Sequence, residues 1–265
     1  MYSLTVECSE ERAEILSAEL WEAGACGIQE DSVPVALVRL RAFFEERPDA
    51  GHFAEYAPLI EVVEETDWES EFRESWPAME VGRRFYLVTP WDSSETPPGR
   101  IRLTIHPGMA FGTGRHQATQ LALEALETHL RTGEDVADIG TGTGILLAAA
   151  HHLGARRMAG CDLDVDSVFV ARENLAADQV PAALFAGSTR ALAPRSVDVL
   201  VANINPETHR SLRTEYARIA RRAVILSGMA GRIEAAGFAP PGFRLTETLT
   251  QDEWTCLVLS RDELS

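Results

Sequence analysis

The first 25 residues carry two different hydrophobic periods, one after the other. Residues 2–8 alternate between apolar and polar side chains, which predicts a half-buried β-strand. Apolar residues then recur at helical spacing, at Ala13, Leu16, Leu20 and Ala23. Ser9 is suited to cap this helix, and the glycines at positions 24 and 27 end it. A strand and an amphipathic helix therefore open the chain.

Three further segments complete a small α+β unit. The pattern predicts strands over residues 35–44 and 59–65, with a short helix over 50–57 between them. Residues 27–35 are suited to one more strand. The order strand, helix, strand, helix, strand predicts a ferredoxin-like, split βαβ arrangement over residues 1–65.

The pattern changes after a charged and aromatic linker. Residues 67–76 (DWESEFRESW) predict a linking helix, residues 85–89 a strand, and residues 92–99 a loop rich in Pro and Ser. We therefore expect three parts: a small domain over residues 1–65, a linker helix and first strand over 66–95, and a larger domain over 96–265.

In the larger domain, short apolar strands alternate with helices. The predicted strands cover residues 136–139, 157–161, 182–185, 197–204 and 223–227. This alternation predicts an α/β fold, in which helices cover both faces of a mostly parallel sheet. Two late apolar runs, residues 243–250 and 253–260, lie close together and predict an antiparallel hairpin that closes the edge of the sheet.

A glycine-rich turn, DIGTGTGIL, follows the first strand of this sheet. Gly140, Gly142 and Gly144 allow a tight turn and a close approach of the backbone to a ligand. The dinucleotide fingerprint GxGxxG fails, because its sixth position is Ile145. The form GxGxG is usual for S-adenosylmethionine, which has no pyrophosphate, and the alternative is an ordinary strand–helix turn.

Two polar residues end later strands, where ligands bind in open α/β sheets. Asp162 lies 22 residues beyond Gly140 and is suited to bind both ribose hydroxyls. Its alternative role is a helix cap, which Asp164 or Asp166 can also provide. Asn203 begins the sequence Asn-Ile-Asn-Pro, which is similar to the Asn-Pro-Pro-aromatic loop of amine methyltransferases but lacks the aromatic residue. The alternative for Asn203 is a turn residue.

Two loops complete the candidate chemistry. The glycines and Phe111 of residues 107–119 (PGMAFGTGRHQAT) predict a loop that folds over the site, although a phosphate loop is an alternative. The Lys-Ser/Thr ending of a P-loop is absent. A lone histidine such as His116 is more often structural than catalytic. Gly187 and Ser188 follow the third strand at the expected adenine edge, where an ordinary turn fits equally well.

Composition and charge narrow the class of protein. The sequence has no run of about 18 apolar residues, no secretory signal and no metal-binding spacing of its four cysteines, so we expect a cytoplasmic protein without a metal or a membrane. Residues 1–80 carry 20 Asp and Glu against 5 Arg, whereas residues 81–265 carry 21 against 19. The acidic first part repels nucleic acid and attracts a basic partner, or it serves only solubility.

The motifs together resemble one family. PGMAFGTGRHQAT, DIGTGTGIL, CDLD, VANI and LSGM in this order resemble the bacterial PrmA family, whose members methylate large-subunit ribosomal protein eleven on lysine and N-terminal amines. The segments DWESEFRESWPAMEVGRRFYLVTPW and EWTCLVL extend the resemblance to nearly the whole chain. It implies a class I, Rossmann-like methyltransferase with a seven-stranded sheet and S-adenosylmethionine as cofactor. It also implies that residues 1–65 recognise a basic ribosomal protein.

The resemblance further implies which residues form the site. Cofactor contacts are expected at Thr119, Gly140, Gly142, Asp162 and Asn203. Asn203 is also the expected catalytic residue, whose carbonyl oxygen is expected to hold the acceptor amine or the methionine end of the cofactor. Asn205 stands where the family has an aliphatic residue, on the expected acceptor side.

Other functions remain as alternatives. One is a class I methyltransferase for a different protein or a small molecule, in which the first module serves as a lid. Another is a non-catalytic, ribosome-associated protein that binds the cofactor, which the intact set of Gly140, Asp162 and Asn203 disfavours. The failed GxGxxG pattern disfavours a nicotinamide oxidoreductase.

Overall fold

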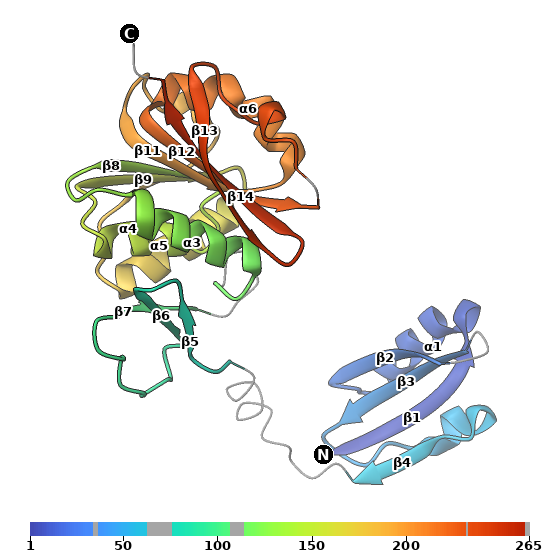
Figure 1. The fold of residues 1–265 in the computed structure, drawn as a ribbon. Coiled ribbons are helices and arrows are strands. Elements are labelled where there is room, and N and C mark those ends of the chain that lie inside the picture. Colours follow the sequence, from blue (N-terminus) through green and yellow to red (C-terminus); the bar gives the residue numbers. More distant parts are fainter. Residues whose placement is uncertain (34–36, 63–75, 107–113, 232, 263–265) are drawn as a thin grey trace. The chain divides into compact units, whose positions relative to one another are not determined.

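The chain divides into two compact units, Met1–Ser75 and Trp76–Ser265 (Figure 1). The computed structural model describes residues 1–33, 37–62, 76–106, 114–231 and 233–262. Each unit has a hydrophobic core of its own. Within the described ranges, none of the helices combines the length and the apolar composition needed to cross a membrane.

The first unit is a four-stranded antiparallel sheet with one α-helix packed on it (Figure 1). Its elements are β1 (Tyr2–Ser9), α1 (Glu10–Glu22), β2 (Gly27–Val33), β3 (Leu37–Phe44), the 3-10 helix η1 (Ala50–Tyr56) and β4 (Leu59–Val62). The strand order β2-β3-β1-β4 is the ferredoxin-like order predicted from the sequence. Leu4 and Val6 of β1 are buried in one core with Leu16 and Leu20 of α1, so the alternating strand meets the apolar stripe of the helix.

Some predictions for the first 104 residues need correction, and one falls on residues that the structure does not describe. Ser9 occupies the N-cap of α1, but its side chain makes no capping hydrogen bond. The predicted linking helix over residues 67–76 lies outside the described residues except for Trp76. Two strands were not predicted: β5 (Met79–Val81) and β7 (Ile101–Thr104) pair with β6 (Phe85–Val88) in a separate three-stranded sheet.

The second unit contains a seven-stranded sheet in the order β10-β9-β8-β11-β12-β14-β13 (Figure 1). Its strands are β8 (Asp135–Ile139), β9 (Arg157–Asp162), β10 (Ala183–Ala186), β11 (Val197–Asn203), β12 (Ala220–Ala230), β13 (Phe243–Gln251) and β14 (Trp254–Arg261). The first five strands are parallel, and β14 is antiparallel to both of its neighbours. The predicted hairpin is confirmed, but β14 lies inside the sheet, so that β13 alone of the two hairpin strands lies at an edge.

Helices cover both faces of this sheet, as the alternation predicted. They are α3 (Gln117–His129), α4 (Ile145–His152), α5 (Val165–Ala177) and α6 (Pro206–Ile219), with short 3-10 helices η2 (Thr189–Ala191) and η3 (Ala235–Gly237). Figure 1 shows α3, α4 and α5 on one face and α6 on the other. Strand β11 alternates accordingly: Val199 and Val201 join the core under α3 and α4, and Leu200 and Ala202 join the core under α6.

A buried carboxylate joins the amino ends of the parallel strands. Asp135 at the start of β8 is 1% exposed and accepts hydrogen bonds from Arg156 and Arg157, while Arg221 lies 3.5 Å away. Arg157 and Arg156 hold the pKa of Asp135 well below its usual range. This ionic cluster is at the opposite end of the sheet from the cavities described below.

We expect Asp135→Asn to lower the free energy of unfolding by about 3 kcal/mol, because three guanidinium groups lose their shared buried carboxylate. Asp262→Asn is the matched control, since Asp262 and its partner Arg244 are both more than half exposed. The control should change the free energy by less than about 1 kcal/mol. Urea denaturation measures both changes. Equal losses of unfolding free energy in the two variants would show that the ion pairs of Asp135 stabilise the fold no more than an exposed pair does.

Candidate functional site

The carboxyl ends of the parallel strands border two adjoining cavities. One of about 450 Å³ lies beside Asn203 and Trp254. The other, of about 370 Å³, lies beside Gly187 and Ser188, the turn that was expected at the adenine edge. Both cavities are lined by Gly140, Asp162, Ile204 and Asn205. Ligands bind at this edge of open α/β sheets.

The glycine turn after β8 requires glycine at each motif position. Gly140, Gly142 and Gly144 have φ angles of 75°, 50° and 84°, which L side chains rarely adopt. A Cβ on Gly140 would lie 2.5 Å from the side chain of Ile204. The N–H groups of Gly140 and Thr141 both donate to the carbonyl of Cys161, at 2.8 and 3.0 Å. Because the glycines have no side chains, the backbone of the turn packs directly against the ends of the neighbouring strands.

Asp162 ends β9 and holds the glycine turn from the other side. Its Oδ2 accepts from the N–H of Gly142 at 3.1 Å, and its Oδ1 accepts from the N–H of Asp164 at 3.1 Å. The cap of α5 is Asp164, which accepts from the N–H groups of Asp166 and Ser167. Asp162 is thus free of the capping role, and each of its oxygens keeps a lone pair for hydroxyl donors in the cavity.

Asn203 at the end of β11 is oriented by α3 and β12. Its Nδ2 donates to the hydroxyl of Thr119 at 3.1 Å, so two residues singled out from the sequence are in direct contact. Its strand partner is Ser227, whose hydroxyl donates to the carbonyl of Ala118 at 2.7 Å. The Oδ1 atom is buried and has no partner among the described residues. An acceptor with no partner beside a cavity is suited to bind an N–H group.

Asn205 has a local role that the sequence analysis missed. It is the N-cap of α6, and its Oδ1 accepts from the N–H of Thr208 at 2.8 Å, with Pro206 in the first turn. Asparagine followed by proline is a recognised helix start, so the signal was present in the sequence. The departure from the family pattern is explained by helix capping, and Asn205 also lines both cavities.

Two rings at the cavity wall were not assigned a role from the sequence. His116 is the N-cap of α3, where its Nδ1 accepts from the N–H of Ala118 at 3.2 Å. Its ring packs edge-on against Trp254 with centroids 4.3 Å apart. Both rings line the cavity beside Asn203. Most of the loop before His116, residues 107–113, lies outside the described residues.

A buried acid lies directly under the glycine turn. Asp138 in β8 is fully buried, its Oδ2 accepts from the hydroxyl of Thr141 at 2.9 Å, and its Oδ1 has no partner among the described residues. Burial raises the pKa of Asp138 to about 7. The folded protein therefore holds a proton at this position in conditions where the unfolded chain has lost it.

This raised pKa predicts a pH dependence of stability. The unfolded chain releases the proton near pH 4 and the folded protein near pH 7, so stability falls as pH rises between these values. Relative to Asp138→Asn, the free energy of unfolding of the wild type should fall by about 3 kcal/mol from pH 4 to pH 7. Urea denaturation of both proteins across this range measures the difference, and a constant difference would refute it.

Comparisons with known proteins agree with this site. The family profile described as "Ribosomal protein L11 methyltransferase (PrmA)" matches residues 51–262. A protein of that name from Geobacter metallireducens is 38% identical over 237 residues, which cover 86% of this chain and 78% of the relative. One from Thermus thermophilus is 35% identical over 249 residues, which cover 91% and 92%.

A solved structure extends the agreement to the fold. The crystal structure of ribosomal protein L11 methylase from Lactobacillus delbrueckii subsp. bulgaricus matches with a TM-score of 0.63 and 29% identity, over 70% of this chain and 99% of that chain. These matches confirm the expected enzyme class, a methyltransferase that uses S-adenosylmethionine. The chain belongs to the ribosomal protein L11 methyltransferase (PrmA) family.

Proposed function

We propose that this enzyme transfers methyl groups from S-adenosylmethionine to lysine side chains and the N-terminal amine of ribosomal protein L11. The observation that carries the proposal is the unpartnered Oδ1 of Asn203, which is buried beside the same cavity that Gly140, Gly142 and Asp162 line. An amine donates N–H groups and needs such an acceptor. The named relatives supply the identity of the protein that carries the amine.

The residues fit the cofactor by the chemistry of their donor and acceptor groups. The carboxylate of Asp162 suits a ribose, and the positive-φ turn at Gly140 and Gly142 lets the backbone approach the ligand closely. The second cavity, beside Gly187 and Ser188, suits the adenine ring. S-adenosylmethionine supplies, when bound, a methyl group on a positively charged sulfur.

The protein's own task is to place the amine and to favour its neutral form, with the proton released to water. A free lysine has a pKa of about 10.4, so it must lose a proton before it can act as a nucleophile. The apolar walls at Ile204 and Trp254 lower the pKa of an amine that enters, because burial disfavours its charged form. Asn203 then orients the neutral amine, and orientation of this kind contributes much of the rate. Among the described residues, none of the groups of His, Cys, Asp and Glu is arranged to hold a metal ion.

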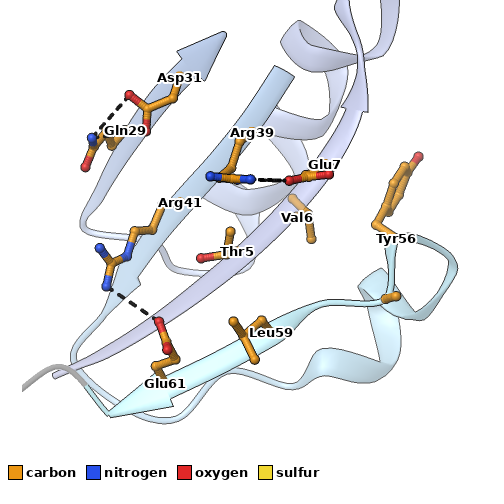
Figure 2. Close-up of a pocket in the computed structure, with 11 residues that line it drawn as sticks. Thr5, Val6, Glu7, Gln29, Asp31, Arg39, Arg41, Tyr56, Leu59 and Glu61 are labelled. Carbon is orange, nitrogen blue, oxygen red and sulfur yellow. Dashed lines mark hydrogen bonds and ion pairs between the residues drawn. The ribbon is translucent and has the colours of Figure 1, made fainter. Parts of the chain in front are cut away.

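The acidic first unit is the proposed docking module for the basic ribosomal protein, with no direct binding of nucleic acid. The open face of its sheet forms a cavity of about 540 Å³, lined by Glu7, Asp31 and Glu61 among others (Figure 2). Glu7 pairs with Arg39 at 2.6 Å and Glu61 with Arg41 at 3.7 Å, and all four side chains are well exposed. Exposed pairs are weak, so these carboxylates can exchange partners with a basic surface.

The test of the function is transfer of labelled methyl groups to unmethylated ribosomal protein L11. We expect label on lysine and N-terminal amines, located by peptide mass spectrometry. Asn203→Ala should reduce the rate at least about 100-fold, because the acceptor amine loses its orienting group. Near-normal transfer by Asn203→Ala would remove that residue from the mechanism. Label only on another protein or a small molecule would favour the alternative substrates and leave the chemistry intact.

A matched pair of variants tests the ribose assignment. Asp162→Asn should weaken binding of S-adenosylmethionine about 10-fold or more, because a charge-assisted hydrogen bond to the ligand is lost. Asp164→Asn makes the same charge change two residues away, and asparagine retains the cap of α5, so its affinity should stay within about twofold. Isothermal titration calorimetry measures both affinities. Equal affinities in the two variants would exclude Asp162 as a ligand of the cofactor.

A further inference from the structure

A fully buried histidine lies under the turn that carries Asn203. His209, in the first turn of α6, has no exposed surface. Its Nε2 is 2.7 Å from the carbonyl oxygen of Ser227, and its Nδ1 is 3.2 Å from the hydroxyl of Tyr216, which is also fully buried. Both ring nitrogens are therefore bound within the protein, on the side of the sheet that α6 covers.

The proton on this ring can be assigned from its partners. Burial lowers the pKa of His209 to about 4, so the imidazole is neutral at neutral pH. A carbonyl oxygen can only accept, so Nε2 carries the hydrogen and donates it to Ser227. Nδ1 is then the acceptor for the hydroxyl of Tyr216. The ring is held in one tautomer and one orientation.

The Ser227 carbonyl is the point where three segments meet. It accepts the short bond from His209 and a longer one, 3.2 Å, from the N–H of Ile204 in the turn after Asn203. The next residue, Gly228, has a φ of 89°, and a Cβ there would lie 2.3 Å from the Ile204 carbonyl and 3.0 Å from Oδ1 of Asn203. A small rotation of the Ser227–Gly228 peptide would therefore move the turn and the Asn203 side chain together.

We propose that His209 is a positioning residue, which fixes the Ser227–Gly228 peptide by its Nε2–H bond and thereby fixes the amide of Asn203 beside the acceptor cavity. The kinetic consequence rests on the proposed amine transfer, whereas the structural consequence does not. Leucine would fill the same space but leave Ser227 with only the longer bond from Ile204, and Tyr216 without its acceptor. Glutamine carries an amide N–H near the position of Nε2 and can restore the bond to Ser227.

Steady-state kinetics of His209→Leu and His209→Gln test the kinetic consequence. We expect His209→Leu to lower kcat about 10- to 100-fold, because the acceptor amine loses its orienting group. The KM for S-adenosylmethionine should change less than about twofold, because the cofactor keeps its expected contacts at Gly140, Gly142 and Asp162. His209→Gln should recover kcat to within about threefold of the wild type. His152→Leu, the same change at an exposed position in α4, is the control and should keep wild-type kcat. Equal losses in the Leu and Gln variants, or no loss in either, would overturn the proposal.

Nuclear magnetic resonance of the Asn203 side-chain amide tests the structural consequence without any substrate. The signal is identified by its absence in Asn203→Ala. We expect two distinct, slowly exchanging amide protons in the wild type and in His209→Gln, and faster exchange in His209→Leu. Identical Asn203 signals in all three proteins would overturn the positioning role. A wild type that fails to methylate ribosomal protein L11 but shows this pattern would refute the substrate and support the role of His209.

Discussion

The turn after β11 packs between two glycines, Gly140 and Gly228, and the arrangement of the site depends on this close packing. On one side of β11, Gly140 after β8 lies against the side chain of Ile204. On the other side, Gly228 in β12 lies against the carbonyl oxygen of Ile204. Neither contact leaves room for a Cβ. Because the backbone is fixed from both sides, Asn203 immediately before Ile204 has little freedom. Its side-chain amide is then oriented by one hydrogen bond, from Nδ2 to the hydroxyl of Thr119.

The two ends of the parallel sheet use different chemistry for different tasks. At the amino ends, the buried carboxylate of Asp135 pairs with three arginines, of which Arg156 and Arg157 are more than half exposed. At the carboxyl ends, hydrogen bonds from backbone N–H groups hold neighbouring turns together. Several polar atoms there can still form hydrogen bonds to a ligand. Ligands bind at the carboxyl ends of the strands in open α/β sheets, and both cavities of this protein lie there.

Periodicity and motif spacing predicted most of the fold, because the helices and the long strands are amphipathic or uniformly apolar over many residues. The same reasoning missed β5 and β7, which have three and four residues and show too little of a period. The motif at Gly140, the strand end at Asp162 and the strand end at Asn203 were visible because each is local in sequence. Asn205 followed by Pro206 is also a local helix-start signal, although the sequence prediction assigned Asn205 only to the acceptor side.

The role of His209 could not be predicted from the sequence, because its partner Ser227 lies 18 residues away on another strand. The wall formed by His116 and Trp254 joins residues from α3 and β14 in the same way. Such pairs arise from the topology of the sheet, and a single sequence without its fold contains no period or spacing that joins them.

The position of β14 between β12 and β13 has a consequence for how the protein is made. Translation produces Trp254–Arg261 after every other strand of the large sheet, yet this strand pairs along both of its edges. Until it leaves the ribosome, β12 and β13 each present an unpaired edge of backbone N–H and carbonyl groups, which other chains can pair with. A truncation before Trp254 would leave both of these strand edges exposed, even though every residue assigned to cofactor binding would still be present.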